Sequence, residues 1–287
     1  LGNNVVSVAT LLQDNGYRTF MAGKWHLGKK AEDLPNKQGF DESFSLLQGG
    51  ASYFNDMMGL TSMVPKGLYR LNGAPVTTLP ENFYASDYYA DFIIDQIELT
   101  QKDRNTEIKA PFFAYLSFTA PHWPLQVKDE HLNLYRGQYD IGYDELQLKR
   151  IKGAIAKGVL SPDTQPSKRA AHIKAWDKLT NEEKKREARA MEIYASVVDR
   201  MDFHLGRVLA YLDENNLRDN TIIIFRCNYQ TTSNREHVSI GTRLTGFDQH
   251  TSVEYGWLIV SQTLHELHTP TSVSDTKLVR VFIHIFI

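Results

Sequence analysis

The segment GYRTFMAGKWHLG, residues 16 to 28, is the stretch around which the rest of the chain is organised. Residues 19 to 22 predict a short buried strand, and Gly23 predicts a bend directly after it. Lys24 and His26 are expected to point the same way, because residues two apart on an extended chain share a face. A lysine and a histidine on one face at a strand end favour a site for an anionic group. The alternative is a solvated lysine and a hydrogen-bonded core histidine.

The composition is that of a globular protein with a substantial core. The 287 residues are 42% hydrophobic and 11% aromatic, enough for one large domain or two small ones. The formal charge of -2 indicates neither nucleic acid nor an anionic membrane as a partner, and no apolar run is long enough for a membrane span. The single Cys227 excludes an internal disulfide. Residues 1–12 lack the basic start and apolar stretch of a secretion signal, so the localisation stays open.

A second candidate side chain follows another apolar run. Residues 112–118, FFAYLSF, come after Pro111 and are rich in β-formers, which is typical of a central strand covered by helices on both faces. Ligands in such sheets bind beyond the carboxyl ends of the strands. His122 lies there between Pro121 and Pro124, on backbone stiff enough to position a proton donor. A loop histidine with a purely structural role is the alternative.

The apolar periodicity places further elements around these two strands. The first is a helix over 5–12 with an apolar stripe of Val5, Val8, Leu11 and Leu12, capped by Asn3 or Asn4 and stopped by Gly16. A hairpin over 69–80 follows, with a type I′ turn at Asn72-Gly73, and then a helix over 86–102 capped by Ser86.

The last two elements lie towards the end of the framework. A long helix starts at a Thr180–Glu183 capping box, carries an apolar stripe from Ile193 to Leu212 and ends at Asn215-Asn216. A buried strand is expected over 221–225.

Two stretches are expected to lie outside this framework. Residues 29–57 are irregular and rich in Gly, Pro and Asp, which indicates an excursion over the sheet edge, where sites are commonly built. Its candidate site members are Gly49, Gly50 and Ser52, although a glycine pair is more often a plain turn. Residues 128–180 are polar and turn-rich and are expected to be an insertion over the rim.

The end of the chain offers one weak metal motif. His265 and His268 in HELH have the spacing of zinc ligands on a helix, but no third ligand follows at a recognisable distance. We therefore predict no zinc site.

Four segments resemble the sulfatase family in sequence and in order. They are residues 16–28, GFDESFSLLQGGASYFND (39–56), PFFAYLSFTAPHWPLQ (111–126) and YASVVDRMDFHLGRVLAYLDENNLRDNTIIIF (194–225). Their order, with GGAS included, is most similar to the arylsulfatase branch. The resemblance implies an α/β fold of the alkaline phosphatase-like superfamily, a mixed β-sheet sandwiched between helices and here incomplete. It also implies a hydrolase that cleaves small-molecule sulfate esters.

The resemblance further implies roles for individual side chains. Sulfatases use a formylglycine nucleophile, made from Cys or Ser in a C/S-x-P/A-x-R motif, and Ca²⁺ as cofactor. By motif, Lys24 would bridge a sulfate oxygen and the nucleophile, and His26 would hydrogen-bond the formylglycine hydroxyls and help eliminate sulfate. His122 would contact the sulfate near the leaving oxygen and help to stabilise or protonate it, while Ser52 is a further expected substrate-binding residue. These roles suit a reaction in which negative charge builds on oxygens.

The chain departs from the family pattern in two places. No C-x-P-x-R or S-x-P-x-R occurs in it, and the segment with that motif and two metal-binding aspartates is expected upstream of Leu1. After 221–225, sulfatases continue with Ser-Asp-Asn-Gly, whereas this chain has Cys-Asn-Tyr-Gln at 227–230. Asn228 is a poorer ligand for a hard cation than a carboxylate, and Tyr229 replaces the second ligand. We therefore expect no formylglycine, most Ca²⁺ ligands to be missing, and no metal-binding residue.

These observations predict a partial sulfatase catalytic domain over 1–225 and a divergent tail of uncertain structure over 226–287. Lys24, His26 and His122 are expected to converge on one site. The chain by itself is not expected to hydrolyse sulfate esters at an enzyme's rate. Two alternatives stay open: a non-catalytic sulfatase remnant, and hydrolysis of phosphodiesters or phosphonates within the same superfamily.

Overall fold

The structure, a computed structural model, describes residues 5–102, 110–225, 243–244 and 247–248. Among these, residues 5–124 and 203–225 belong to one compact unit, and residues 125–202 belong to a second. The last two short segments, β8 (Arg243–Leu244) and β9 (Phe247–Asp248), form an antiparallel pair. Five 3₁₀ turns are also described: Ala31–Asp33, Pro35–Lys37, Asp129–His131, Trp176–Lys178 and Arg218–Asn220.

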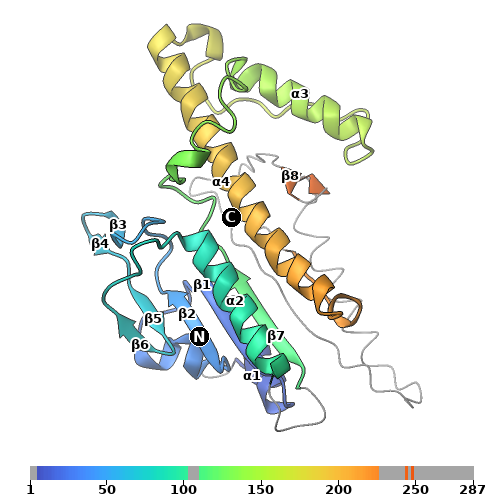
Figure 1. The fold of residues 1–287 in the computed structure, drawn as a ribbon. Coiled ribbons are helices and arrows are strands. Elements are labelled where there is room, and N and C mark those ends of the chain that lie inside the picture. The colour runs from blue at the N-terminus through green and yellow to red at the C-terminus, as the bar shows by residue number, and fades with distance from the viewer. Residues whose placement is uncertain (1–4, 103–109, 226–242, 245–246, 249–287) are drawn as a thin grey trace. The chain divides into compact units, whose positions relative to one another are not determined.

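The first unit is built on a five-stranded mixed sheet with the order β6-β5-β2-β1-β7 (Figure 1). Its three parallel neighbours are β2 (Glu42–Leu46), β1 (Arg18–Lys24) and β7 (Phe112–Ser117). The β5–β6 hairpin (Tyr69–Leu71 and Ala74–Val76) extends the sheet in the antiparallel sense, and β3 (Met58–Thr61) and β4 (Val64–Lys66) form a separate hairpin. Because three neighbouring strands run in parallel, their carboxyl ends lie along one edge of the sheet.

Helices cover both faces of this sheet. α2 (Ala85–Lys102) runs along the strands in Figure 1, and three of its aromatic rings contact Phe44 of β2. Phe44 is in register with Ala22, so the adjacent Met21 points to the opposite face, where it packs with Ala9 of α1. The predicted α/β fold with a mixed sheet between helices is therefore confirmed for the described residues.

Two local predictions about helix ends need correction. α1 spans Val8–Asp14 and is capped by Ser7, whose Oγ accepts a hydrogen bond from the Thr10 N–H (3.0 Å), not by Asn3 or Asn4. α2 begins at Ala85, so Ser86 lies inside the first turn.

The predicted apolar stripe of α1 is wrong except at Leu12, which packs against the core. Val5, Val8 and Leu11 are about half exposed, and Ala9 is the buried residue. The reason is a close approach: a Cβ on Gly39 would lie 2.1 Å from the Thr10 nitrogen, so the helix backbone packs directly on this glycine and a small residue faces the sheet.

The sheet differs from the sequence prediction in three further ways. Residues 29–57 were expected to be an excursion, but they contain β2, whose Ser43 and Ser45 are fully buried. β7 is the terminal strand of the described sheet instead of a central one. Within the predicted strand over 221–225, Thr221 makes a β-bridge, and residues 222–225 form no strand in the described structure. The polar serines of β2 interrupt the apolar pattern from which a buried strand is predicted.

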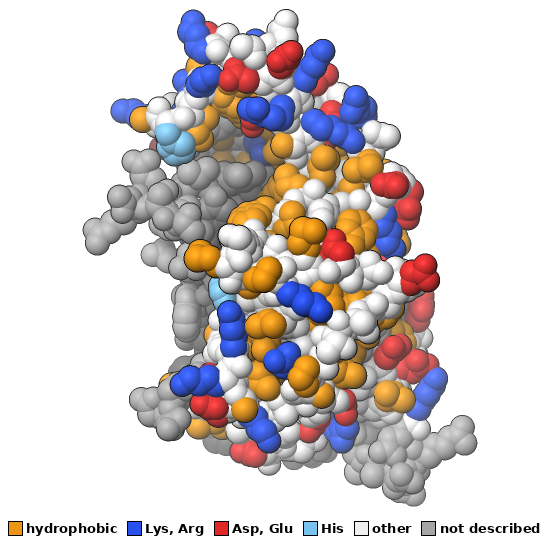
Figure 2. All heavy atoms as spheres, turned by 90° about the vertical axis from the view of Figure 1, so that its left-hand side faces the viewer, with side chains coloured by type: hydrophobic (Ala, Val, Ile, Leu, Met, Phe, Trp, Pro, Cys, Tyr) orange, Lys and Arg blue, Asp and Glu red, His pale blue; other side chains and the backbone are white. Residues whose placement is uncertain are grey.

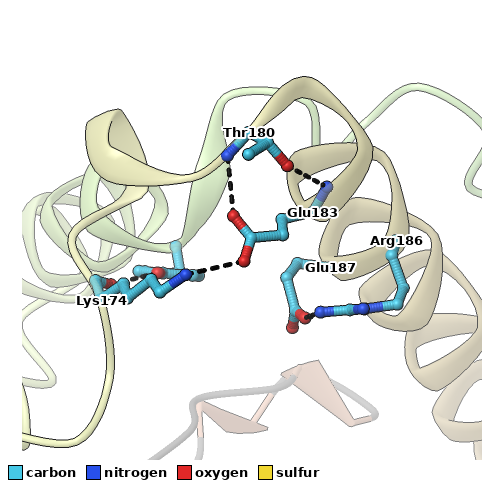
Figure 3. A network of polar contacts seen from close by, with 6 residues as sticks. Lys174, Thr180, Glu183, Arg186 and Glu187 are labelled. Carbon is cyan, nitrogen blue, oxygen red and sulfur yellow. Dashed lines mark hydrogen bonds and ion pairs between the residues drawn. The ribbon is translucent and has the colours of Figure 1, made fainter.

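Two predicted features are confirmed at the level of single bonds. Asn72 (φ 51°) and Gly73 (φ 85°) both adopt the left-handed backbone conformation that a type I′ turn requires between β5 and β6. At the start of α4 (Asn181–Glu214), the Glu183 N–H donates to Thr180 Oγ1 (3.1 Å), and the Thr180 N–H donates to Glu183 Oε2 (2.8 Å) (Figure 3).

The rest of α4 also agrees with the sequence. The expected stripe is buried at Val197, Met201, Leu205, Val208 and Leu212, and the helix ends before Asn216, which has φ 56°. Residues 128–180, expected to be an insertion over the rim, contain α3 (Gly142–Ala156), and their place over the rim stays a prediction. None of the described helices is both long and apolar enough to cross a membrane. On the face shown in Figure 2, basic and acidic side chains are interspersed.

Candidate anion-binding site

The candidate site lies at the carboxyl edge of the three parallel strands. Lys24 is the last residue of β1, Gly49 and Gly50 follow β2, and His122 follows β7. Because these strands are neighbours in the order β2-β1-β7, the segments after them come together. Such an edge is where ligands of parallel α/β sheets bind.

Lys24 is held at this edge by the central strand. It is in register with Leu46 of β2 and is only 8% exposed. Burial lowers the pKa of Lys24, because loss of solvent disfavours the ammonium form. An anion bound next to Lys24 would favour the charged form and offset that cost.

Gly23 does not form the predicted bend. It remains within β1 and pairs with Ser45 on one side and Ser117 on the other. Its φ is +113°, and a Cβ there would lie 1.8 Å from the Ser117 carbonyl oxygen. The glycine is therefore required by a close approach of β7 to β1.

The conformation of His26 differs from the sequence argument as well. β1 ends at Lys24, so the two-residue repeat of a strand does not extend to His26. His26 has a left-handed φ of 57°, unusual for a residue with a side chain, and its N–H donates to the Leu47 carbonyl (3.2 Å). This bond ties the segment after β1 to the segment after β2.

Electrostatics nevertheless places His26 with the other two candidates. Partial desolvation lowers the pKa of His26, and the positive charges of Lys24, His122 and Lys29 lower it further. Charges act on a titrating group in this way only at short range when solvent screens them. His26 thus lies in a local excess of positive charge, which is the property an anion site needs.

The glycine pair after β2 lies against both histidine rings. A Cβ on Gly49 would be 3.1 Å from Cε1 of His26, and one on Gly50 would be 3.4 Å from Nδ1 of His122 and 2.9 Å from Cδ1 of Leu60. Since two consecutive residues touch the two rings, His26 and His122 lie close together. The structure thus brings the rings of His26 and His122 together at the edge of the sheet where β1 ends in Lys24. That the three side chains form one binding site stays a prediction.

The backbone around His122 is held by several hydrogen bonds. The His122 N–H donates to the Thr119 carbonyl (3.0 Å). The buried Tyr53 hydroxyl donates to the His122 carbonyl and, at 3.4 Å, to the Thr119 carbonyl. His122 Nδ1 lies 2.7 Å from the Trp123 carbonyl oxygen, which can only accept, so Nδ1 carries a proton. Nε2 is then the nitrogen that can exchange a proton with a substrate.

Ser52 has a local structural role. Its buried hydroxyl accepts a hydrogen bond from the Phe54 N–H (3.3 Å), and its N–H donates to the Met58 carbonyl (2.7 Å). Both partners lie close to it in sequence. Its expected part in substrate binding stays a prediction.

The described residues do not fit the Ca²⁺ site that the resemblance implies. Across 5–102 and 110–225, no group of three or more His, Cys, Asp or Glu side chains could hold a metal ion. The side chains of Lys24 and the two histidines offer only nitrogen atoms, whereas Ca²⁺ requires oxygen ligands. Residues 227–230 and the HELH histidines lie outside the described residues.

Sequence reasoning missed Tyr53 and treated the glycine pair as optional. Tyr53 follows the GGAS segment directly, and this proximity to GGAS was the available signal. Its partner is His122, 69 residues further along the chain, and no local pattern predicts such a contact. A Cβ would be tight against the His26 ring at Gly49 and against the Leu60 side chain at Gly50.

Comparison with known proteins shows the family to which this chain belongs. The family model described as Sulfatase matches residues 1–226. An uncharacterized sulfatase of Schizosaccharomyces pombe is 42% identical over 231 residues, 78% of this chain and 41% of that protein. An arylsulfatase of Klebsiella aerogenes is 36% identical over 225 residues, 78% of this chain and 47% of that protein. The chain thus spans less than half the length of both relatives.

Solved structures show more distant similarity. Ps i-CgsB in complex with k-i-k-neocarrahexaose is 24% identical with a TM-score of 0.48, over 76% of this chain and 40% of that one. The PsFucS1 sulfatase from Pseudoalteromonas sp. is 17% identical with a TM-score of 0.41, over 74% and 35%. The family model and the two sequence relatives show that this chain belongs to the sulfatase family, hydrolases that act on sulfuric esters.

Proposed function

We propose that this chain contains the sulfate-binding part of a sulfuric ester hydrolase site, formed by Lys24, His26 and His122. The observation that carries the proposal is geometric: Gly49 and Gly50 lie against the rings of His26 and His122, at the carboxyl edge of the sheet where β1 ends in the buried Lys24. Desolvation and the positive charges of the neighbours also lower the pKa of His26. A sulfate group is a small anion that would compensate such a cluster. Family membership supports this choice of anion.

Each of the three side chains has a distinct role in the proposal. The buried Lys24 ammonium binds a sulfate oxygen and favours the charge that builds there. His26, next to Gly49, donates to a second oxygen of the bound group. His122 has its Nδ1 occupied by a carbonyl, and its Nε2 stabilises or protonates the oxygen that leaves with the alcohol.

We further propose that the chain binds sulfate but does not hydrolyse sulfate esters at an enzyme's rate. It contains no C-x-P-x-R or S-x-P-x-R from which the family's formylglycine could be made. Without a covalent nucleophile, the reaction cannot be divided into two easier steps. Loss of one member of a catalytic set can reduce the rate on the order of 10⁶-fold.

Calorimetric titration with sodium sulfate tests the binding part. Lys24→Met keeps the side chain's apolar stem but removes the charge, so we expect sulfate affinity to fall roughly tenfold or more. Lys30→Met removes the same charge from an exposed lysine and is expected to leave the affinity unchanged. Absence of sulfate binding to the wild-type chain, or equal losses in both variants, would refute the proposal.

Turnover is tested with 4-nitrophenyl sulfate and added Ca²⁺. We expect no release of 4-nitrophenol above a buffer blank. Turnover that disappears in Lys24→Met would show that a nucleophile operates which the sequence does not reveal. Tighter binding of dimethyl phosphate or methyl phosphonate than of methyl sulfate would instead favour the phosphodiester and phosphonate alternatives.

A further inference from the structure

Trp123 is an unusual residue at this sheet edge. Its side chain is 53% exposed, whereas Phe118 and Ala120, just before it, are fully buried. Single exposed apolar residues are common on protein surfaces. What distinguishes Trp123 is its position next to a candidate catalytic histidine, with which it makes a ring contact and a hydrogen bond.

The indole ring has a fixed neighbour. It stacks on the His122 imidazole with ring centroids 5.5 Å apart and an interplanar angle of 30°. Its carbonyl oxygen accepts the Nδ1 proton of the same histidine (2.7 Å). An exposed aromatic ring that is already ordered loses little conformational entropy when a ligand packs on it.

The candidate site has a cationic end and an apolar end. The buried Lys24 at the end of β1 supplies the cationic end, and the His26 ring lies beside Gly49. Leu60 lies beside His122, since a Cβ on Gly50 would contact both side chains. His122 is therefore bordered by two apolar side chains, Leu60 and Trp123, in addition to the cationic group.

We propose that Trp123 is the residue that determines the leaving-group preference of this site, by packing against the flat apolar face of an aromatic alcohol. This inference rests on the proposed sulfate site: the sulfate occupies the cationic end, His122 contacts the ester oxygen, and the ring attached to that oxygen lies on the indole. Offset aromatic stacking contributes about 0.5–1.5 kcal/mol beyond the area buried. The selectivity concerns the alcohol and leaves the sulfate contacts unchanged.

Equilibrium titration of the full chain with inorganic sulfate, methyl sulfate, phenyl sulfate and galactose 6-sulfate tests the inference. We expect phenyl sulfate to bind about fivefold more tightly than methyl sulfate. Trp123→Leu should remove this difference and change inorganic sulfate affinity less than twofold, while Trp123→Phe should retain most of it. Phe203→Leu removes another half-exposed aromatic ring and should retain all of it.

The outcomes separate this inference from the proposed function. Failure of the wild-type chain to bind inorganic sulfate contradicts the proposed function. Lys24-dependent sulfate binding combined with equal affinities for phenyl and methyl sulfate, or with a phenyl advantage that survives Trp123→Leu, overturns only the inference about Trp123. A preference for galactose 6-sulfate over phenyl sulfate that is lost in Trp123→Leu overturns the aromatic assignment in favour of a sugar.

Discussion

The hydroxyl of Tyr53 donates a hydrogen bond to the carbonyl oxygen of His122, so the segment that follows β2 holds the segment that follows β7. The same hydroxyl lies 3.4 Å from the Thr119 carbonyl oxygen. Tyr53 does not contact the imidazole through these bonds. It positions the backbone on which His122 is held.

Tyr53→Phe tests this positioning role. Loss of the hydroxyl leaves the buried carbonyl without this donor and should lower the free energy of unfolding by about 1 kcal/mol. Sulfate affinity should fall as well, because His122 is less well ordered. Chemical denaturation and calorimetry measure the two effects. Tyr84→Phe, which removes a hydroxyl from another fully buried tyrosine, is the control and should leave sulfate affinity unchanged.

Gly49→Ala should affect the site more than the fold. Gly49 does not have a left-handed φ, so alanine causes no backbone strain, but its Cβ would lie 3.1 Å from Cε1 of His26. We expect the ring to move by a few tenths of an ångström and sulfate affinity to fall severalfold, with little change in the unfolding free energy. Unchanged affinity would show that His26 does not contact the anion.

Gly23→Ala should affect the fold more than the site. Its φ of +113° disfavours alanine, and the Cβ would overlap the Ser117 carbonyl oxygen at 1.8 Å. Backbone strain and overpacking together predict a loss of about 3 kcal/mol or more. Thermal unfolding followed by circular dichroism measures it, and a stable Gly23→Ala variant would contradict the β1–β7 register.

The titration of His26 provides a pH test. Desolvation and the charges of Lys24, His122 and Lys29 place its folded-state pKa below 6.5. The unfolded chain therefore takes up this proton first, and His26 reduces folded stability as the pH falls from 6.5 through the folded-state pKa. Sulfate should raise the pKa of His26 and bind more tightly in acid.

Histidine NMR titration measures this directly. Lys24→Met should raise the pKa of His26 because a positive charge is removed, whereas Lys30→Met should not. If the pKa of His26 changes neither in Lys24→Met nor on addition of sulfate, the three side chains do not share a site.

The capping box of α4 provides a second pH test. The hydrogen bond from Lys174 and the N–H of Thr180 lower the pKa of Glu183 from 4.5 to about 2 (Figure 3). The stabilisation is present above pH 4.5 and is lost as the pH falls towards 2. Thr180→Ala should destabilise the helix start by about 1 kcal/mol and speed amide exchange at Glu183. Thr180→Ser should not.

The sequence by itself determined the features that neighbouring residues encode. The apolar runs predicted β1 and β7, although not the position of β7 at the end of the described sheet. Asn72-Gly73 predicted the type I′ turn, and Thr180 with Glu183 predicted the start of α4. Motif resemblance singled out Lys24, His26 and His122. Each of these signals is contained in a few consecutive residues, so local sterics and hydrogen bonding are sufficient to produce it.

Tertiary structure decided what depends on residues far apart in the chain. The parallel order β2-β1-β7 brings the segments after three strands together, and Tyr53 bonds to a carbonyl 69 residues away. β2 is a strand despite its serines because β1 and β5 pair with it on either side. Residues 222–225 are apolar and rich in isoleucine, yet they form no strand in the described structure. A strand is stable only with a partner, and pairing is a property of the fold.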